Sequence, residues 1–238
     1  MHPEWKHLTS SDLNLDEDEC LCMLIKLSNV LRGPLDKWQS TLNGNEIAAA
    51  DRFRNSHDRN RYIASRYLLT SFLELVFKKK PLIFLNKNGK PLLAASTGYF
   101  NLSHAGEYLL MAFSHQPVGV DIEKINYFSE IEFIKNNFYH PGERSEINQA
   151  PTECSVKRFF TCWTRKEALL KAMGCGLSIK TESFRVSCIP NRPALIQGPD
   201  PNNNHWVIFN LPEIDSAYSA SICLHNEPKN IKYRLVNL

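Results

Sequence analysis

Two short stretches, about forty residues apart, constrain this chain more than any other feature: residues 119–123 (GVDIE) and 163–171 (WTRKEALLK). The first ends an alternating apolar run that predicts a strand, so Asp121 and Glu123 should point to the same face. The second has no glycine or proline and favours a helix, on which Glu167 and Lys171 are i,i+4 neighbours. Three carboxylates and a lysine therefore meet if that helix packs over that strand.

Carboxylates this close raise each other's pKa unless a cation joins them. Magnesium prefers a few carboxylates, water and phosphate oxygens, so an all-oxygen site beside a lysine points to phosphate chemistry. Each stretch alone fits equally well a charged strand end or an exposed helical ion pair. Their combination, with the glycines that follow the helix, favours a magnesium site.

The same residues resemble the Sfp-type 4'-phosphopantetheinyl transferases, the family named after the enzyme that activates surfactin synthetase. Its pattern is G-x-D-x-E, then W-x-x-K-E-x-x-x-K, then a glycine-containing turn, and every fixed position is present in this chain. The resemblance extends upstream to residues 89–91 (GKP) and 101–104 (NLSH), and covers most of residues 50–190. The order of the motifs is more specific than any one of them.

Composition excludes several other classes of protein. The 238 residues are 43% hydrophobic, enough for a real core, and no apolar run reaches the length of a membrane span. Residues 1–19 are polar and acidic, unlike a signal peptide, so we expect a cytoplasmic protein without a membrane partner. Seven cysteines without a C-x-x-C pair argue against disulfides and zinc, and a net charge of +3 is too small to indicate nucleic acid.

The pattern of elements predicts an α+β fold in two halves, residues 1–117 and 118–238. Each half carries one long helix, expected at residues 57–77 and 155–173, and the strands 108–114 and 218–224 are similar in type and position. The family has two related halves, so the resemblance implies a pseudo-dimer. In it, each small antiparallel sheet packs on a long helix, and the active site lies in the cleft between the halves.

The resemblance implies a reaction in which coenzyme A and an apo carrier protein give the holo carrier and adenosine 3',5'-bisphosphate. The carrier serine attacks the β-phosphorus of coenzyme A. Asp121, Glu123 and Glu167 match the metal ligands, for Mg²⁺ or Mn²⁺, and Lys171 matches a lysine beside the pyrophosphate. Either Glu167 or Glu143 could accept the serine proton, and the sequence does not decide between them. Lys166 is predicted either to reach phosphate or to lie on the surface facing the carrier.

Coenzyme A contacts also follow from the resemblance. The matching positions near adenine, the 3'-phosphate and the pyrophosphate are Arg61, Lys90, Pro91, Ser103 and His104. Other members carry lysines where this chain has Glu46 and Ala49, and Arg52 and Arg54 are candidates to replace them.

Partners and alternatives complete these expectations. The carrier is expected to dock on residues 124–128. The two-halved length implies a monomer and a preference for carrier domains of secondary-metabolite synthases. A magnesium-dependent nuclease and a non-catalytic module that binds coenzyme A or a carrier remain alternatives.

Overall fold

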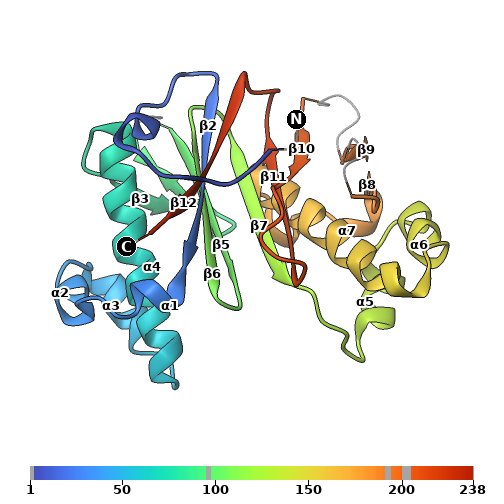
Figure 1. The fold of residues 1–238 in the computed structure, drawn as a ribbon, viewed down its shortest axis with the longest axis horizontal. Coiled ribbons are helices and arrows are strands. Elements are labelled where there is room, and N and C mark those ends of the chain that lie inside the picture. The colour runs from blue at the N-terminus through green and yellow to red at the C-terminus, as the bar shows by residue number, and fades with distance from the viewer. Residues whose placement is uncertain (1–2, 95–97, 191–193, 200–204, 238) are drawn as a thin grey trace.

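The protein consists of four layers, in the order helix, sheet, sheet and helix (Figure 1). The computed structural model describes residues 3–94, 98–190, 194–199 and 205–237. One sheet has five strands in the order β1-β12-β2-β6-β5, and the other has three in the order β10-β11-β7. Two short hairpins, β3-β4 and β8-β9, lie outside these sheets. The predicted α+β class is confirmed.

The bounds of the elements agree closely with the expected long helices. The helices are α1 (Leu27–Val30), α2 (Leu35–Gln39), α3 (Gly44–Ala50), α4 (Ser56–Phe77), α5 (Ile131–Phe138), α6 (Pro141–Asn148) and α7 (Thr152–Met173). The strands are β1 (Lys6–His7), β2 (Glu19–Lys26), β3 (Ile83–Leu85), β4 (Pro91–Leu93), β5 (Tyr99–Ala105), β6 (Tyr108–Ser114), β7 (Val118–Lys124), β8 (Arg185–Val186), β9 (Leu195–Gln197), β10 (Val207–Asn210), β11 (Tyr218–Leu224) and β12 (Asn230–Val236).

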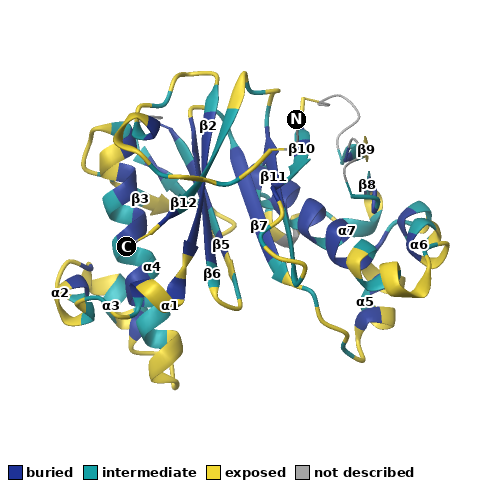
Figure 2. Ribbon diagram, in the orientation of Figure 1, coloured by how far each residue is buried: buried dark blue, intermediate teal, exposed yellow. Residues whose placement is uncertain are grey.

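Alternation along the strands builds the layers, because successive side chains point to opposite faces of a sheet. On β2, Leu21 and Met23 join the core under α4, whereas Cys20 and Cys22 join an apolar cluster between the two sheets. The strands at the centre are accordingly buried on both faces (Figure 2). The same rule places Val118, Val120 and Ile122 of β7 in the cluster between the sheets. Asp121 and Glu123 are thereby left on the face that α7 covers, as predicted.

Gly119 explains why the first motif begins with glycine. A Cβ atom at this position would lie 2.1 Å from the Ala168 carbonyl oxygen and 2.3 Å from the Ala172 backbone nitrogen. Any side chain would therefore push α7 away from β7. The helix that carries Glu167 and Lys171 can approach the strand that carries Asp121 only because this residue has no side chain.

The last strand crosses between the halves. β12 lies between β1 and β2 and runs parallel to both, so the five-stranded sheet is not antiparallel throughout. A segment that the sequence assigned to the second half thus completes the sheet of the first. The division of the chain at residue 117 remains a prediction. The two halves are joined by a shared sheet as well as by the connecting segment.

Candidate functional site

Ser103, Asp121 and Lys171 meet where the two sheets adjoin, and they come from three different elements: β5, β7 and α7. Asp121 Oδ1 accepts hydrogen bonds from Lys171 Nζ at 2.6 Å and from Ser103 Oγ at 2.9 Å. Lys171 Nζ also donates to Ser103 Oγ at 3.1 Å. The motifs that the sequence placed at residues 101–104, 119–123 and 163–171 therefore converge on one point.

Glu123 and Glu167 lie close enough to Asp121 and Lys171 to interact with their charges. Burial, followed by the negative charges of Asp121 and Glu167, raises the pKa of Glu123 to about 7. Burial and the charge of Asp121 likewise raise the pKa of Glu167, while Lys171 opposes the shift. The pKa of Asp121 is raised by burial, against the lowering effect of Lys171. Three carboxylates with raised pKa values and one lysine form an acidic site with a shortage of positive charge.

The chemistry of these groups fits a hard divalent cation. Asp121 Oδ2 is buried and has no hydrogen-bond partner among the residues that the structure describes, although a carboxylate oxygen enclosed by protein requires one. Oxygen ligands alone suit Mg²⁺. In the described part of the chain, no group of three or more His, Cys, Asp or Glu side chains is gathered closely enough to hold a metal. The ligand set Asp121, Glu123 and Glu167 therefore stays a prediction that the donor chemistry supports.

Arg61 and His104 form a second group of polar side chains beside the first, in which Arg61 carries the positive charge. Arg61 Nη2 donates to the Gly106 carbonyl at 2.7 Å, which ties α4 to the turn between β5 and β6. Desolvation, followed by the positive charges of Arg61 and Lys171, lowers the pKa of His104. His104 lies next to Ser103 on β5 but points to the opposite face, toward α4, because side chains alternate. Ser103, Asp121 and Lys171 therefore lie on one face of β5, and His104 and Arg61 lie on the other.

A cavity of about 310 Å³ opens between the β3-β4 hairpin and the C-terminal end of α7. Lys90, Pro91, Glu167 and Lys171 all line it, so four of the predicted residues share one hollow. Asn101 lines it as well. Lys90 Nζ, however, is directed at backbone carbonyls, 2.9 Å from Ala172 O and 3.4 Å from Val118 O.

Glu143, one of the two candidate bases, lies outside this group. Its side chain has no exposed surface, and Oε1 forms an ion pair of 2.8 Å with Lys166 Nζ. Its other oxygen accepts from the His140 backbone nitrogen and closes a capping box at the start of α6. A carboxylate whose two oxygens are so enclosed is a structural group.

Lys166 is buried too, so the prediction that it is a surface lysine or a phosphate ligand is wrong. Besides Glu143, Lys166 Nζ donates to the carbonyls of Thr181 at 2.6 Å and Phe184 at 2.9 Å. Helical geometry turns Lys166 about 100° from Glu167, and that direction leads into the core of the second half.

Asn101 belongs to the motif at residues 101–104, but the sequence analysis gave it no role of its own. Its side-chain oxygen accepts from the Val120 backbone nitrogen at 2.8 Å, and the residue is buried. β5 and β7 belong to different sheets, and this bond joins their edges next to Asp121. Asn101 lies two residues before Ser103 and so shares its face of β5. That spacing was a signal from which it could have been found.

Glu46, at a position where other family members carry a lysine, has its own ion-pair partner in this structure. Glu46 forms an ion pair with Arg66, 2.7 Å from Nη2 to Oε1, and Arg66 Nε also donates to it at 2.8 Å. Glu46 is therefore engaged within the protein. Arg52 and Arg54, the candidate replacements for the missing lysines, are both exposed in the segment between α3 and α4.

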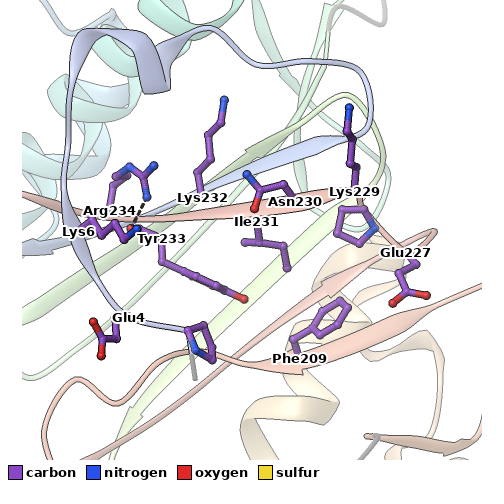
Figure 3. A pocket seen from close by; sticks show the side chains of 12 residues that line it. Glu4, Lys6, Phe209, Glu227, Lys229, Asn230, Ile231, Lys232, Tyr233 and Arg234 are labelled. Atoms are coloured by element: carbon purple, nitrogen blue, oxygen red, sulfur yellow. Dashed lines mark hydrogen bonds between the residues drawn. The ribbon is translucent and has the colours of Figure 1, made fainter. Parts of the chain in front are cut away.

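A larger cavity, about 620 Å³, lies between β12 and β10, and it contains none of the predicted site residues (Figure 3). Two of its cations are already neutralised. Lys232 pairs with Glu19, and Arg234 pairs with Asp12, each at 2.6 Å. Size alone does not identify a functional site, and we take the convergence of charged groups at Asp121 as the candidate site.

Comparison with known proteins identifies the family of the chain. The model of the 4'-phosphopantetheinyl transferase superfamily matches residues 117–223, a range that contains Asp121, Glu167 and Lys171. The chain is 33% identical over 215 residues to the 4'-phosphopantetheinyl transferase HetI of Nostoc sp., covering 84% of this chain and 89% of the relative. It is 27% identical over 192 residues to the 4'-phosphopantetheinyl transferase Sfp of Bacillus subtilis, covering 79% of this chain and 84% of the relative.

A solved structure titled Chronobacterium ammoniagenes ACPS-CoA complex also matches, at 18% identity and a TM-score of 0.34, over 46% of this chain and 95% of that one. This similarity is too weak to add to the sequence relatives. The match to the relative at 33% identity spans most of both chains. The family model covers Asp121 as well as Glu167 and Lys171. This chain therefore belongs to the 4'-phosphopantetheinyl transferase superfamily and is an enzyme of that class.

Proposed function

We propose that this enzyme transfers the 4'-phosphopantetheine group of coenzyme A to a serine of an apo acyl or peptidyl carrier protein. The serine oxygen forms a bond to the β-phosphorus of coenzyme A, the pyrophosphate P–O bond breaks, and adenosine 3',5'-bisphosphate leaves with its electron pair. The serine proton passes to a carboxylate. The observation that carries the proposal is the convergence of Ser103, Asp121, Glu123, Glu167 and Lys171 at one acidic and cationic point.

Phosphoryl transfer depends chiefly on position and charge, and this site supplies both. Lys171 is held in place by Asp121 and Ser103, so its ammonium needs little reorganisation when negative charge develops nearby. Glu167 lines the same cavity, and burial and the charge of Asp121 raise its pKa, which increases the basicity of its carboxylate. Since Glu143 is enclosed, we assign the base to Glu167.

We propose Mg²⁺ as the cofactor, held by Asp121, Glu123 and Glu167. A bound divalent ion would supply charge neutralisation for the pyrophosphate. We therefore expect that removal of metal with a chelator abolishes transfer and that added Mg²⁺ or Mn²⁺ restores it. The measurement is the rate of carrier modification before and after metal is returned. Full activity in metal-free buffer would contradict the assignment.

The nucleotide of coenzyme A is proposed to lie along Pro91, Ser103, His104 and Arg61. The support is positional: Pro91 lines the cavity, and His104 lies near the positive charges of Arg61 and Lys171. Exposed Arg52 and Arg54 supply further charge at the start of α4 for the 3'-phosphate.

The carrier is proposed to dock on the segment after β7. Tyr127 is 77% exposed and Phe133, on α5, is 63% exposed, so this side presents large apolar side chains near Lys124. Carrier domains of secondary-metabolite synthases are the expected substrates, checked by comparing their rates with that of a fatty-acid carrier. The enzyme is proposed to act as a monomer, and a trimer in light scattering would contradict that.

Replacing Lys171 by alanine should lower the rate of transfer about 10²-fold, the usual effect of losing one preorganised charge at a reacting group. Coenzyme A affinity should fall less, because Arg61 and His104 remain. Single-turnover transfer at saturating coenzyme A measures the effect. Lys157→Ala, which removes an exposed lysine from the same helix, is the matched control. Equal rates for Lys171→Ala and the parent enzyme would refute the role.

The reaction itself is tested by incubating the enzyme with apo carrier, coenzyme A and Mg²⁺. We expect holo carrier and adenosine 3',5'-bisphosphate in equal amounts. Tight binding of coenzyme A without product would favour the alternative of a non-catalytic binding module.

A further inference from the structure

Lys90 belongs to the motif at residues 89–91, and resemblance alone suggests that its ammonium binds a phosphate of coenzyme A. The structure gives the ammonium different partners. Lys90 Nζ lies 2.9 Å from the carbonyl oxygen of Ala172, in the last turn of α7, and 3.4 Å from that of Val118, the first residue of β7. Both oxygens belong to the backbone elements that carry the acidic site.

The last carbonyls of a helix have no partner within the helix and carry partial negative charge. At the end of α7, a second pair of donors supports Lys90. The side-chain nitrogens of Asn86 and Asn88 each donate to Gly174 O at 3.0 Å. Three side chains from one hairpin thus converge on the C-terminal turn of one helix.

The hairpin is rigid where these side chains leave it. Asn86 Oδ1 accepts from the backbone nitrogens of Asn88 and Lys90, each at 2.9 Å, and closes the turn between β3 and β4. Burial lowers the pKa of Lys90 to about 8, which agrees with an ammonium enclosed by protein. Contact with a phosphate would require Lys90 to release two carbonyls of the backbone, at a cost for each buried acceptor left unpaired.

The turn that Lys90 holds is next to the site. Ala172 follows Lys171 directly, and Glu167 lies little more than one helical turn earlier. Gly119, which follows Val118, allows the helix to touch β7 at Ala168 and Ala172. Lys90 therefore joins the hairpin, β7 and α7 at the place that sets the distance between Asp121 and Lys171.

We propose that Lys90 is a positioning residue, which together with Asn88 clamps the C-terminal turn of α7 so that Glu167 and Lys171 face Asp121, and that its ammonium does not bind the 3'-phosphate. This inference rests on the proposed function for its kinetic consequences. Its structural part, the clamp on α7, stands independently.

The test compares Lys90→Met, which keeps the length of the side chain without its donors, with Lys90→Arg and Asn88→Ala. Lys87→Met, an exposed lysine in the same hairpin, is the control. Each variant is assayed with coenzyme A and with 3'-dephospho-coenzyme A. We expect Lys90→Met to lower kcat about tenfold or more for both substrates, since misplaced catalytic groups have effects of this size. KM and the preference for coenzyme A over its dephospho form should stay unchanged. Lys90→Arg should recover part of kcat, and Asn88→Ala should show a smaller loss.

Two results would overturn the proposal. A fall in the preference for coenzyme A in Lys90→Met would show that Lys90 does contact the 3'-phosphate. An unchanged kcat, with only a lower melting temperature, would show a stabilising group without influence on the site.

Hydrogen–deuterium exchange of the peptide spanning residues 168–176 tests the clamp without activity. Exchange should be faster in Lys90→Met than in Lys87→Met, and equal exchange would refute the clamp. If the parent enzyme modifies no carrier while exchange still rises in Lys90→Met, the proposed function fails and the clamp survives.

Discussion

Replacement of Asp121 by alanine should abolish transfer, at least 10³-fold, and leave the folded protein as stable as the parent or more so. The loss of activity is expected because Asp121 is the shared partner of Ser103 and Lys171 and a proposed metal ligand. The preserved stability follows from the position of the carboxylate. Asp121 is buried, and within the described part of the chain its Oδ2 has no hydrogen-bond partner.

The sign of the stability effect follows from the direction of the pKa shift. Burial raises the pKa of Asp121 above its value in the unfolded chain. The folded state then binds more protons than the unfolded state between the two pKa values, so stability falls as pH rises through that range. The full penalty is present above the folded-state pKa, and removing the carboxylate relieves it. Lys171, whose side chain is 30% exposed, can turn to water once its partner is gone.

The measurements for Asp121→Ala are the transfer rate and the melting temperature. Asp121→Asn, which keeps the size and one acceptor, should be equally inactive. A variant that unfolds at the temperature of the assay would contradict the predicted stability. One that stays folded and retains more than about a tenth of the activity would contradict a site role for Asp121.

Lys166→Ala, unlike Asp121→Ala, should destabilise the protein. We expect a loss of about 3–5 kcal/mol in the free energy of unfolding, because the substitution leaves a buried carboxylate without its cation. The ion pair of Lys166 with Glu143, at 2.8 Å, looks much like that of Lys171 with Asp121, at 2.6 Å. The difference lies in exposure. The side chains of the first pair are 2% and 0% exposed, so neither charge can reach water.

Urea unfolding of Lys166→Ala measures this loss, with Lys157→Ala on the exposed side of the same helix as the control. The double variant with Lys166→Met and Glu143→Gln should regain part of the stability, because both buried charges are then absent. A loss below 1 kcal/mol in Lys166→Ala would mean that Glu143 finds another partner or is protonated.

The sequence predicted the directions of the candidate site's side chains where the periodicity of a strand or a helix decides them. A period of two placed Asp121 and Glu123 together, and a spacing of four aligned Glu167 with Lys171. Hydrophobic pattern alone also indicated the long helices to within a few residues. These features depend on local geometry, which the chain carries at each position.

Tertiary placement escaped prediction. Lys166 lies one residue from Glu167, and no local signal distinguishes a lysine that finds a buried glutamate more than twenty residues away from one that lies on the surface. β12, near the end of the chain, pairs with β2, near its beginning, and Lys232 and Arg234 obscure the alternation of apolar and polar residues along β12. Asn101 and the donors of the β3-β4 hairpin act on backbone atoms of other elements, which a motif does not record.

The most direct measurement is the intact mass of an apo carrier protein after incubation with coenzyme A, Mg²⁺ and either the parent enzyme or Asp121→Ala. The account predicts that the parent adds one phosphopantetheine group to the carrier serine and that Asp121→Ala, although folded, adds none. A carrier of unchanged mass with the folded parent enzyme, across fatty-acid and secondary-metabolite carriers, would contradict the central claim. Equal modification by the variant would move the chemistry away from the site at Asp121.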